Sequence, residues 1–189
     1  MVQRPSGVVE PLPLIVLRAG QSPVRQGEPC AGPWTVESGV LRVSVVDDDG
    51  RELILDLAGP GDVIAGVAGC PSPWTARAIG PARLLPGPPG ALDAVVERLA
   101  QLALQLAWCS VQERVERRLL DLATRLGYPV PGGLAVGVPI TQDDLAAMVG
   151  ASRESTNRAI RRSVAERRLD VPRRGRYVVR SPLRVVGSE

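Results

Sequence analysis

A change of pattern at residues 86–90, P-G-P-P-G, divides this chain into two kinds of sequence and limits the folds open to it. Before it, from Leu14 to Pro86, short apolar runs are broken repeatedly by Gly and Pro, as in an all-β barrel or sandwich. After it, residues 91–126 contain neither Pro nor Gly, and apolar residues recur at helical spacing. The sequence therefore predicts an α+β protein, with a β domain followed by a helix far longer than the mean of about 11–12 residues.

Three strands are predicted in the first part, at Leu14–Arg18, Gly39–Val46 and Glu52–Leu57. The last two are separated by D-D-D-G at residues 47–50, and Asp-Gly favours a tight hairpin turn. Residues 59–62, G-P-G-D, form a second turn. These signals favour a small β-roll with a jelly-roll-like arrangement.

The long helix is predicted over residues 91–126, and its middle, residues 102–111, is apolar on nearly every side. Such a helix must be covered on every side. The β domain can cover one face, and a second copy of the same helix is the simplest cover for the other, which predicts a homodimer. The alternative is a central helix buried within a monomer. Gly127 and the Pro and Gly residues at 129–133 are predicted to end the helix and form the turn between domains.

Two short helices are predicted next. Thr141 is a good N-cap with Asp144 as its capping-box partner, and Gly150 ends the helix in a left-handed conformation. Ser152 then caps a second helix, whose inner side is predicted to carry Thr156, Ala159, Ile160, Ser163 and Val164. Two short helices joined by a three-residue turn that contains Gly form a helix-turn-helix.

The start of the second helix carries the side chains that base-edge recognition requires. Arg can bond guanine bidentately, Asn can bond adenine, and Glu can accept from cytosine. The predicted base-reading residues are Arg153, Glu154, Asn157 and Arg158. The alternative is an ordinary helical hairpin with a solvated charged face.

A small hairpin follows, with strands at Leu169–Val171 and Arg176–Val179 and an Arg-rich turn at residues 172–175. A basic hairpin directly after a recognition helix is typical of a winged helix, and its Arg residues suit the phosphate backbone. The predicted phosphate contacts are Thr141, Gln142, Ser152, Ser155, Thr156, Arg161, Arg162, Arg173, Arg174 and Arg176.

The charge distribution agrees with a polyanion partner. Residues 1–109 hold 8 Arg and 11 acidic residues, a net charge of −3, whereas residues 151–189 hold 11 Arg and 4 acidic residues, a net charge of +7. A basic C-terminal segment on an acidic body indicates a polyanion partner, and the alternative is a solvated basic face. With the predicted winged helix-turn-helix, the expected partner is double-stranded DNA.

The composition also excludes several kinds of chemistry. The 189 residues include no His, so His-ligated zinc, His-ligated haem and a triad with a His base are excluded. The three Cys, at 30, 70 and 109, form no close pair, so no metal or cofactor is expected. No catalytic constellation is present, and we expect a protein that is not an enzyme. Scattered Cys and the absence of a signal peptide or membrane span predict a cytoplasmic protein.

These segments together resemble the Crp/Fnr family of bacterial transcription regulators. The densest match is T-Q-D-D-L-A-A-M-V-G-A-S-R-E-S-T-N-R, residues 141–158, and further matches lie in residues 17–29, 37–43 and 49–64. The resemblance implies a β-roll effector-like domain at 1–90, a dimerisation helix at 91–127 and a winged helix-turn-helix at 128–189. It also implies a near-palindromic operator and activation through contact with RNA polymerase.

The chain departs from the cyclic-nucleotide-binding members of that family at two positions. Those members carry a Glu for the ribose and an Arg for the cyclic phosphate. Here the first position is occupied by Gly66, and the second falls near Ser72. A buried cyclic phosphate without a cationic partner is poorly held, so cyclic AMP is not expected to bind.

Three modes of control remain open from the sequence. The dimer can be constitutively competent. It can be regulated by thiol chemistry at Cys30, Cys70 or Cys109, or by an apolar or anionic molecule in a pocket lined by Trp34, Trp74 and Trp108. A protein-binding winged helix that does not bind DNA is the alternative from another class.

Overall fold

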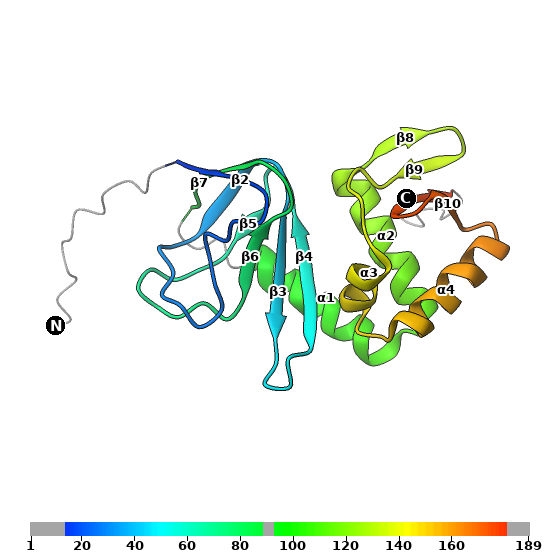
Figure 1. Cartoon of the computed structure of the whole chain (residues 1–189), viewed down its shortest axis with the longest axis horizontal. Helices are drawn as coiled ribbons and strands as arrows, with labels where there is room; N and C mark the ends of the chain where they lie inside the picture. Colours follow the sequence, from blue (N-terminus) through cyan, green and yellow to red (C-terminus); the bar gives the residue numbers. More distant parts are fainter. Residues whose placement is uncertain (1–13, 89–92, 181–189) are drawn as a thin grey trace, which may run out of the picture.

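The computed structural model describes residues 14–88 and 93–180. A β domain and a mainly helical C-terminal domain lie side by side, and two consecutive helices run between them (Figure 1). This is the predicted α+β architecture of β-roll, helical segment and winged helix-turn-helix. No helix in the described ranges is long and apolar enough to cross a membrane.

The β domain is built from two sheets that enclose an aliphatic core. One sheet has the order β1-β7-β2-β5 and the other β4-β3-β6. The strands are β1 (Ile15–Leu17), β2 (Trp34–Ser38), β3 (Leu41–Val46), β4 (Glu52–Ala58), β5 (Val63–Ile64), β6 (Thr75–Ala78) and β7 (Ala82–Pro86). Trp34, Leu41 and Leu84 are among its fully buried side chains. The three predicted strands are confirmed as β1, β3 and β4, and the predicted turn at residues 47–50 joins β3 to β4.

The helical segment consists of two helices, α1 (Asp93–Trp108) and α2 (Val111–Leu126). The prediction of one uninterrupted helix over 91–126 is therefore wrong. Ser110 is extended, with φ −62° and ψ 160°, and forms a capping box with Glu113 that starts a new helix. Hydrogen bonds from the backbone and side chain of Ser110 hold the pKa of Glu113 below its ordinary value.

The C-terminal domain contains α3 (Gln142–Val149), α4 (Arg153–Ala165) and a four-stranded sheet of order β10-β11-β9-β8. Its strands are β8 (Tyr128–Val130), β9 (Gly133–Ala135), β10 (Leu169–Arg173) and β11 (Arg176–Arg180). The predicted turn between domains at residues 127–133 is wrong, because this segment forms the β8–β9 hairpin. β9 pairs with β11, so the wing is part of a larger sheet.

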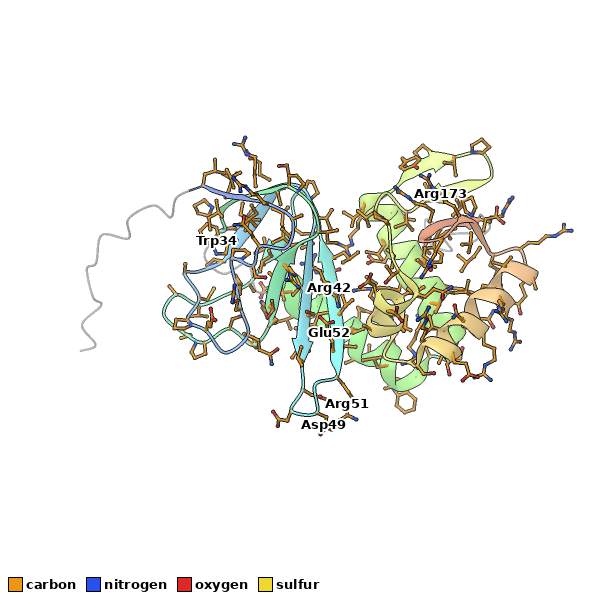
Figure 2. All side chains as sticks on the ribbon, viewed as in Figure 1. Trp34, Arg42, Asp49, Arg51, Glu52 and Arg173 are labelled. Atoms are coloured by element: carbon orange, nitrogen blue, oxygen red, sulfur yellow. The ribbon has the colours of Figure 1, made fainter. Side chains whose placement is uncertain are left out.

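A single hydrophobic cluster joins the two domains. Ile54 and Leu57 of β4 are buried together with Leu119 of α2 and with Leu145 and Met148 of α3. An ion pair crosses the same boundary, since Arg42 Nη1 on β3 donates to Asp144 Oδ1 on α3 over 2.9 Å. Figure 2 shows Arg42 and Glu52 on the sheet that faces the C-terminal domain. The helix-turn-helix is thus packed against the β-roll in one orientation.

Candidate nucleic-acid interface

The second helix of the helix-turn-helix, α4, lies on the side of the C-terminal domain that faces away from the β-roll (Figure 1). Its inner residues Thr156, Ala159, Ile160 and Ser163 are buried against α2 and α3. Its outer residues are exposed and mostly cationic: Arg153, Glu154, Arg158, Arg161 and Arg162. The helical period separates these two sets, because residues three and four apart share a face.

The turn between α3 and α4 has the predicted geometry. Gly150 is left-handed, with φ 58° and ψ 48°, and its N–H donates to Ala146 O. Thr141 and Asp144 form the capping box that starts α3, and Ser152 Oγ accepts from Ser155 N to start α4. The outward first turn of α4 is therefore fixed by local hydrogen bonds and leaves its side chains free to contact a partner.

The charges at the start of α4 have weak partners in the free protein. The nitrogen–oxygen distances there are 3.4 Å for Arg153 with Asp143 and 3.8 Å for Arg158 with Glu154, whereas Arg162 near the end of the helix lies 3.0 Å from Glu166. The Arg158 and Glu154 side chains remain 72% and 86% exposed. Exposed pairs of this kind stabilise a protein by about 1 kcal/mol or less, so a ligand can displace them at little cost.

The wing contributes further exposed arginines. Arg173 ends β10 and Arg174 lies in the turn, and both are exposed, whereas Arg176 at the start of β11 is half-buried. Figure 2 shows Arg173 on the C-terminal domain, at the β10–β11 hairpin. Arg180 at the far end of β11 pairs with Asp170, which raises the pKa of Arg180 through a hydrogen bond and the carboxylate charge.

Most predicted contact residues occupy positions that a nucleic acid can reach. Arg153, Glu154 and Arg158 are exposed, and Asn157 is half-buried beside them. Of the predicted phosphate contacts, the exposed ones are Thr141, Ser152, Arg161, Arg162, Arg173 and Arg174, and the half-buried ones are Gln142, Ser155 and Arg176. The Thr141 hydroxyl already donates to Asp144 Oδ2 over 2.6 Å.

Two residues of α4 differ from the sequence prediction. Thr156 is 0% exposed, so the prediction that it contacts phosphate is wrong. It shares the inner face with Ala159, Ile160 and Ser163, and a side chain on that face points into the protein core. Val164, predicted on the inner side, is 39% exposed because it lies at the outer edge of that face.

The β domain has little space in the cavity that it forms with α1. A cavity of about 30 Å³ lies between the β-roll and α1, lined by residues such as Leu55, Trp74 and Leu99. About 30 Å³ is the share of one water molecule in the liquid, whereas small-molecule sites are usually about 300–1,000 Å³. This cavity is therefore too small for a nucleotide.

The two positions that depart from the family pattern have other roles. A Cβ added at Gly66 would overlap Cys30 Sγ, so a Glu cannot be accommodated there without movement. Ser72 is 3% exposed, and its hydroxyl donates to Trp74 O over 2.7 Å. Neither position supplies a cation or an acceptor for a cyclic nucleotide.

A network of ion pairs ties the β-roll to both helices, and it was not predicted from the sequence. Asp56 Oδ1 accepts from Arg125 Nη2 over 2.6 Å, and Asp62 Oδ2 accepts from Arg125 Nη1 over 2.8 Å. Arg98 of α1 donates to Asp62 Oδ1 over 2.8 Å. Arg118 of α2 lies 3.6 Å from Asp56 and donates to Leu55 O. β4, the turn between β4 and β5, α1 and α2 are thereby linked beside the small cavity.

The pKa values of the two arginines of α2 are shifted in opposite directions. Desolvation lowers the pKa of Arg118, although the charges of Asp56 and Asp121 oppose that effect. Desolvation also acts to lower the pKa of Arg125, but the hydrogen bond to Asp121 and the carboxylates of Asp56 and Asp62 raise it above its ordinary value. Both guanidinium groups stay charged, and the ion pairs of the network therefore persist.

The cysteines and tryptophans do not form one site. Cys30 is buried, Cys70 is exposed and Cys109 is half-buried in the break between α1 and α2. Trp34 is in the β-roll core, Trp74 lines the small cavity and Trp108 is 83% exposed at the end of α1. The three tryptophans therefore do not line one pocket, and core packing, the default for each of them, holds for Trp34. Within the described residues, no cluster of three or more acidic or cysteine side chains could hold a metal ion.

Comparison with known proteins places this geometry in a class. Residues 14–98 match the family model described as a cyclic nucleotide-binding domain, and residues 113–184 match a Crp-like helix-turn-helix domain. Proteins with these two domains in this order are DNA-binding transcription regulators. The chain belongs to the Crp/Fnr family of such regulators.

Individual relatives agree with that assignment. The chain is 29% identical to the CRP-like cAMP-activated global transcriptional regulator of Mycobacterium tuberculosis, over 75% of this chain and 72% of the relative. A Crp/Fnr family regulator of Thermus thermophilus, TTHA1359, superposes with a TM-score of 0.70 at 25% identity, covering 89% of this chain and 94% of that one. FixK2 of Bradyrhizobium japonicum has the same fold, with a TM-score of 0.73 at 21% identity over 89% and 92% of the two chains.

Proposed function

We propose that this Crp-family regulator binds DNA as a homodimer and reads its operator with the outer face of α4. The observation that carries the proposal is the exposure of Arg153, Glu154 and Arg158 on the first turns of a helix whose other side is buried. Recognition helices place such residues against base edges in the major groove. Asn157, half-buried beside them, is proposed as a fourth base contact.

The cationic residues around these base readers are proposed to bind the phosphate backbone. Arg161 and Arg162 extend the strip along α4, and Arg173, Arg174 and Arg176 supply the wing. Phosphate contacts add affinity and fix the register on the duplex, but they carry little sequence information. The polar residues at the two helix starts are proposed to complete this set: Thr141, Gln142, Ser152 and Ser155.

An apolar stripe along α1 supports a homodimer. Val96, Leu104 and Trp108 are 60%, 54% and 83% exposed. They lie eight and four residues apart, so they share one helix face with the exposed alanines at positions 100, 103 and 107. A second α1 would cover this stripe, and two-fold symmetry would present two α4 helices to major grooves about 34 Å apart.

We propose that DNA binding does not require cyclic AMP. The cavity of about 30 Å³ is too small for a nucleotide, and the one arginine among its lining residues, Arg98, is paired with Asp56 and Asp62. These ion pairs join the β-roll to α1 without a ligand. The relative in Mycobacterium tuberculosis is named as cAMP-activated, and we infer that this chain differs from it.

The resemblance to the family also supports a role as an activator that contacts RNA polymerase in the cytoplasm. Members of the family regulate transcription, and we propose that this chain does so in the cytoplasm. Thiol regulation is a second candidate, because Cys70 is exposed and its carbonyl accepts from Cys30 N over 2.9 Å. Under thiol regulation, DNA binding changes when reductant is added, whereas without thiol regulation DNA binding is the same with and without reductant.

Selection of bound duplexes from a random pool tests this proposal directly. The full chain is used with and without reductant and with and without cyclic AMP. We expect one near-palindromic site with half-sites one helical turn apart, recovered equally in every condition. A site recovered only with cyclic AMP would contradict nucleotide independence, and dependence on reductant would favour thiol control. Failure to enrich any duplex would favour a winged helix that binds protein.

The dimer is tested by placing a charge in the apolar stripe. Leu104→Asp should shift the chain from dimer to monomer in sedimentation velocity, since a buried unpaired carboxylate opposes association. Val16→Asp is the matched control, because Val16 is 70% exposed on β1, away from α1. A dimer that survives Leu104→Asp would show that α1 is not the interface.

A further inference from the structure

A cavity of about 200 Å³ lies where the β-roll meets the helix-turn-helix. Its β-roll wall includes Ile54 and Leu57 of β4, and its other wall includes Ile140 and Met148, before and within α3. Liquid water occupies about 30 Å³ per molecule, so the space equals about seven waters. It is several times larger than the cavity beside α1, and it is formed by both domains.

Two arginines give this apolar cavity a cationic wall. Arg42 on β3 and Arg77 on β6 are direct cross-strand neighbours, and both line the cavity. Opposed residues on neighbouring strands point to the same face of a sheet. Their guanidinium groups therefore lie on one side of the cavity. Because the two residues are directly opposite each other, their positive charges repel.

The hydrogen-bonding capacity of these arginines is incompletely used. Arg42 donates through Nη1 to Asp144 and through Nη2 to Glu52, but its Nε is buried without a partner. Arg77 donates through Nε to Gly20 O over 3.0 Å. Arg77 is exposed, and its four remaining N–H groups have no protein partner within the described residues, so they face solvent and are available to a ligand. A guanidinium has five donors, and a planar carboxylate is a good acceptor for two of them at once.

We propose that this interdomain cavity binds a small organic acid, with the carboxylate on Arg77, next to Arg42, and an apolar body between Leu57 and Met148. The two arginines and the carboxylates of Glu52 and Asp144 sum to zero charge, so the acid is held by its direct contact with Arg77 and not by a net positive charge. Arg42 is already balanced by Glu52 and Asp144, whereas Arg77 has no carboxylate partner in the part of the chain that the structure describes. The volume is too small for a nucleotide and sufficient for a single substituted ring.

A ligand in this cavity is placed to affect DNA binding. Asp144 both caps α3 and receives Arg42, so the cavity borders the first helix of the helix-turn-helix. An occupant that draws Arg42 toward itself weakens the contact between β3 and α3. This regulatory consequence rests on the proposed DNA-binding function, while occupation of the cavity does not.

The binding test uses two fluorinated acids, 4-fluorobenzoate and 4-fluorophenylacetate, with 4-fluorobenzyl alcohol as the uncharged control. Titration of the full chain is followed by ¹⁹F NMR. We expect saturable binding of at least one acid with a Kd at or below about 1 mM, and much weaker binding of the alcohol. Arg77→Gln should weaken acid binding about tenfold, since a charge-assisted hydrogen bond is lost.

Two further variants make the result specific to this cavity. Arg83→Gln removes a half-exposed arginine of β7 that pairs with Glu37, and acid binding should be unchanged. Ile79→Trp places a large ring on the cavity wall and should abolish acid binding while circular dichroism shows a folded protein. Equal binding of acid and alcohol, no loss in Arg77→Gln, or no binding of either acid would overturn the proposal.

Duplex affinity is measured on the same samples. If the acid binds and DNA does not, the proposed function fails and the cavity assignment stands. If DNA binds and the acids do not, the cavity assignment fails and the proposed function stands.

Discussion

The ion-pair network beside α1 and the outer face of α4 use the same residue types in opposite ways. Both combine Arg with Asp or Glu. In the network, the Arg118 and Asp56 side chains are 12% and 13% exposed, whereas Arg158 and Glu154 on α4 are 72% and 86% exposed. Breaking a buried pair leaves an uncompensated charge, but an exposed pair can exchange partners at little cost. Exposure thus separates arginines that hold the domains together from arginines available to DNA.

The same contrast appears in how the arginines are paired. Between the β-roll and α1, protein carboxylates pair with the arginines, and the cavity beside them has a volume of about 30 Å³, the share of about one water. On α4 and the wing, most arginines face solvent. The buried ion pairs therefore hold the β-roll against α1 and α2, while the outer face of α4 stays accessible.

The greatest loss of stability should come from a substitution in the buried ion-pair network. Asp56→Asn removes the carboxylate that contacts Arg98, Arg118 and Arg125, and it leaves these charges partly uncompensated. Breaking a buried pair costs about 3–5 kcal/mol, and we expect a loss near the lower end because the asparagine retains an acceptor. Urea unfolding measures the change in the free energy of unfolding.

Asp49→Asn is the matched control for that substitution. Asp49 pairs with Arg51 at the tip of the β3–β4 hairpin, where both side chains are more than 70% exposed. Figure 2 shows both residues at this tip. We expect a change within about 0.5 kcal/mol. Equal losses in the two variants would show that burial does not distinguish the network from a surface pair.

The next effect tests whether the two domains share one core. Ile54 is 0% exposed in the cluster that joins β4 to α2 and α3. Ile54→Ala should cost about 2–5 kcal/mol and increase amide hydrogen exchange in α3 as well as in β4. Leu84→Ala is the control, because Leu84 is equally buried in the separate β-roll cluster. An exchange increase confined to the β-roll in both variants would mean that the domains are independent.

A smaller change, in the free energy of DNA binding, distinguishes base-reading residues from phosphate contacts on α4 and the wing. Arg158→Ala should cost about 1–3 kcal/mol on the selected operator and relax specificity at one base pair. Arg173→Ala on the wing should weaken binding to all sequences alike and reduce the salt slope by about 1. Fluorescence anisotropy on operator variants separates the two outcomes. A uniform loss across all sequences in Arg158→Ala would reassign this residue to the backbone.

Local sequence signals predicted the elements that carry the proposed DNA contacts. Gly150, the Thr141 capping box and the Ser152 N-cap each act within a few residues, and the structure has all three where the sequence placed them. The turn at residues 47–50 was predictable for the same reason. Such features depend on short-range hydrogen bonds and backbone conformation, which one sequence is enough to reveal.

The features that were missed depend on long-range contacts or on competing signals. The break at Ser110 had a local signal, the capping box S-V-Q-E, but continuous apolar spacing concealed it. The β8–β9 hairpin lies in a Pro- and Gly-rich segment, and its pairing with β11 supplies the reason for strand formation. The Asp56–Arg125 pair joins residues 69 positions apart, a contact that no local pattern encodes.

Whether α4 recognises DNA without a cyclic nucleotide is decided by a salt titration of duplex affinity. The full chain is titrated with its selected operator and with a scrambled duplex, in the absence and presence of cyclic AMP. We predict specific binding at least about 10³-fold tighter than to the scrambled duplex, a steep decrease with salt, and no change on adding cyclic AMP. Equal affinity for both duplexes, or specific binding that appears only with cyclic AMP, would refute nucleotide-independent recognition by α4.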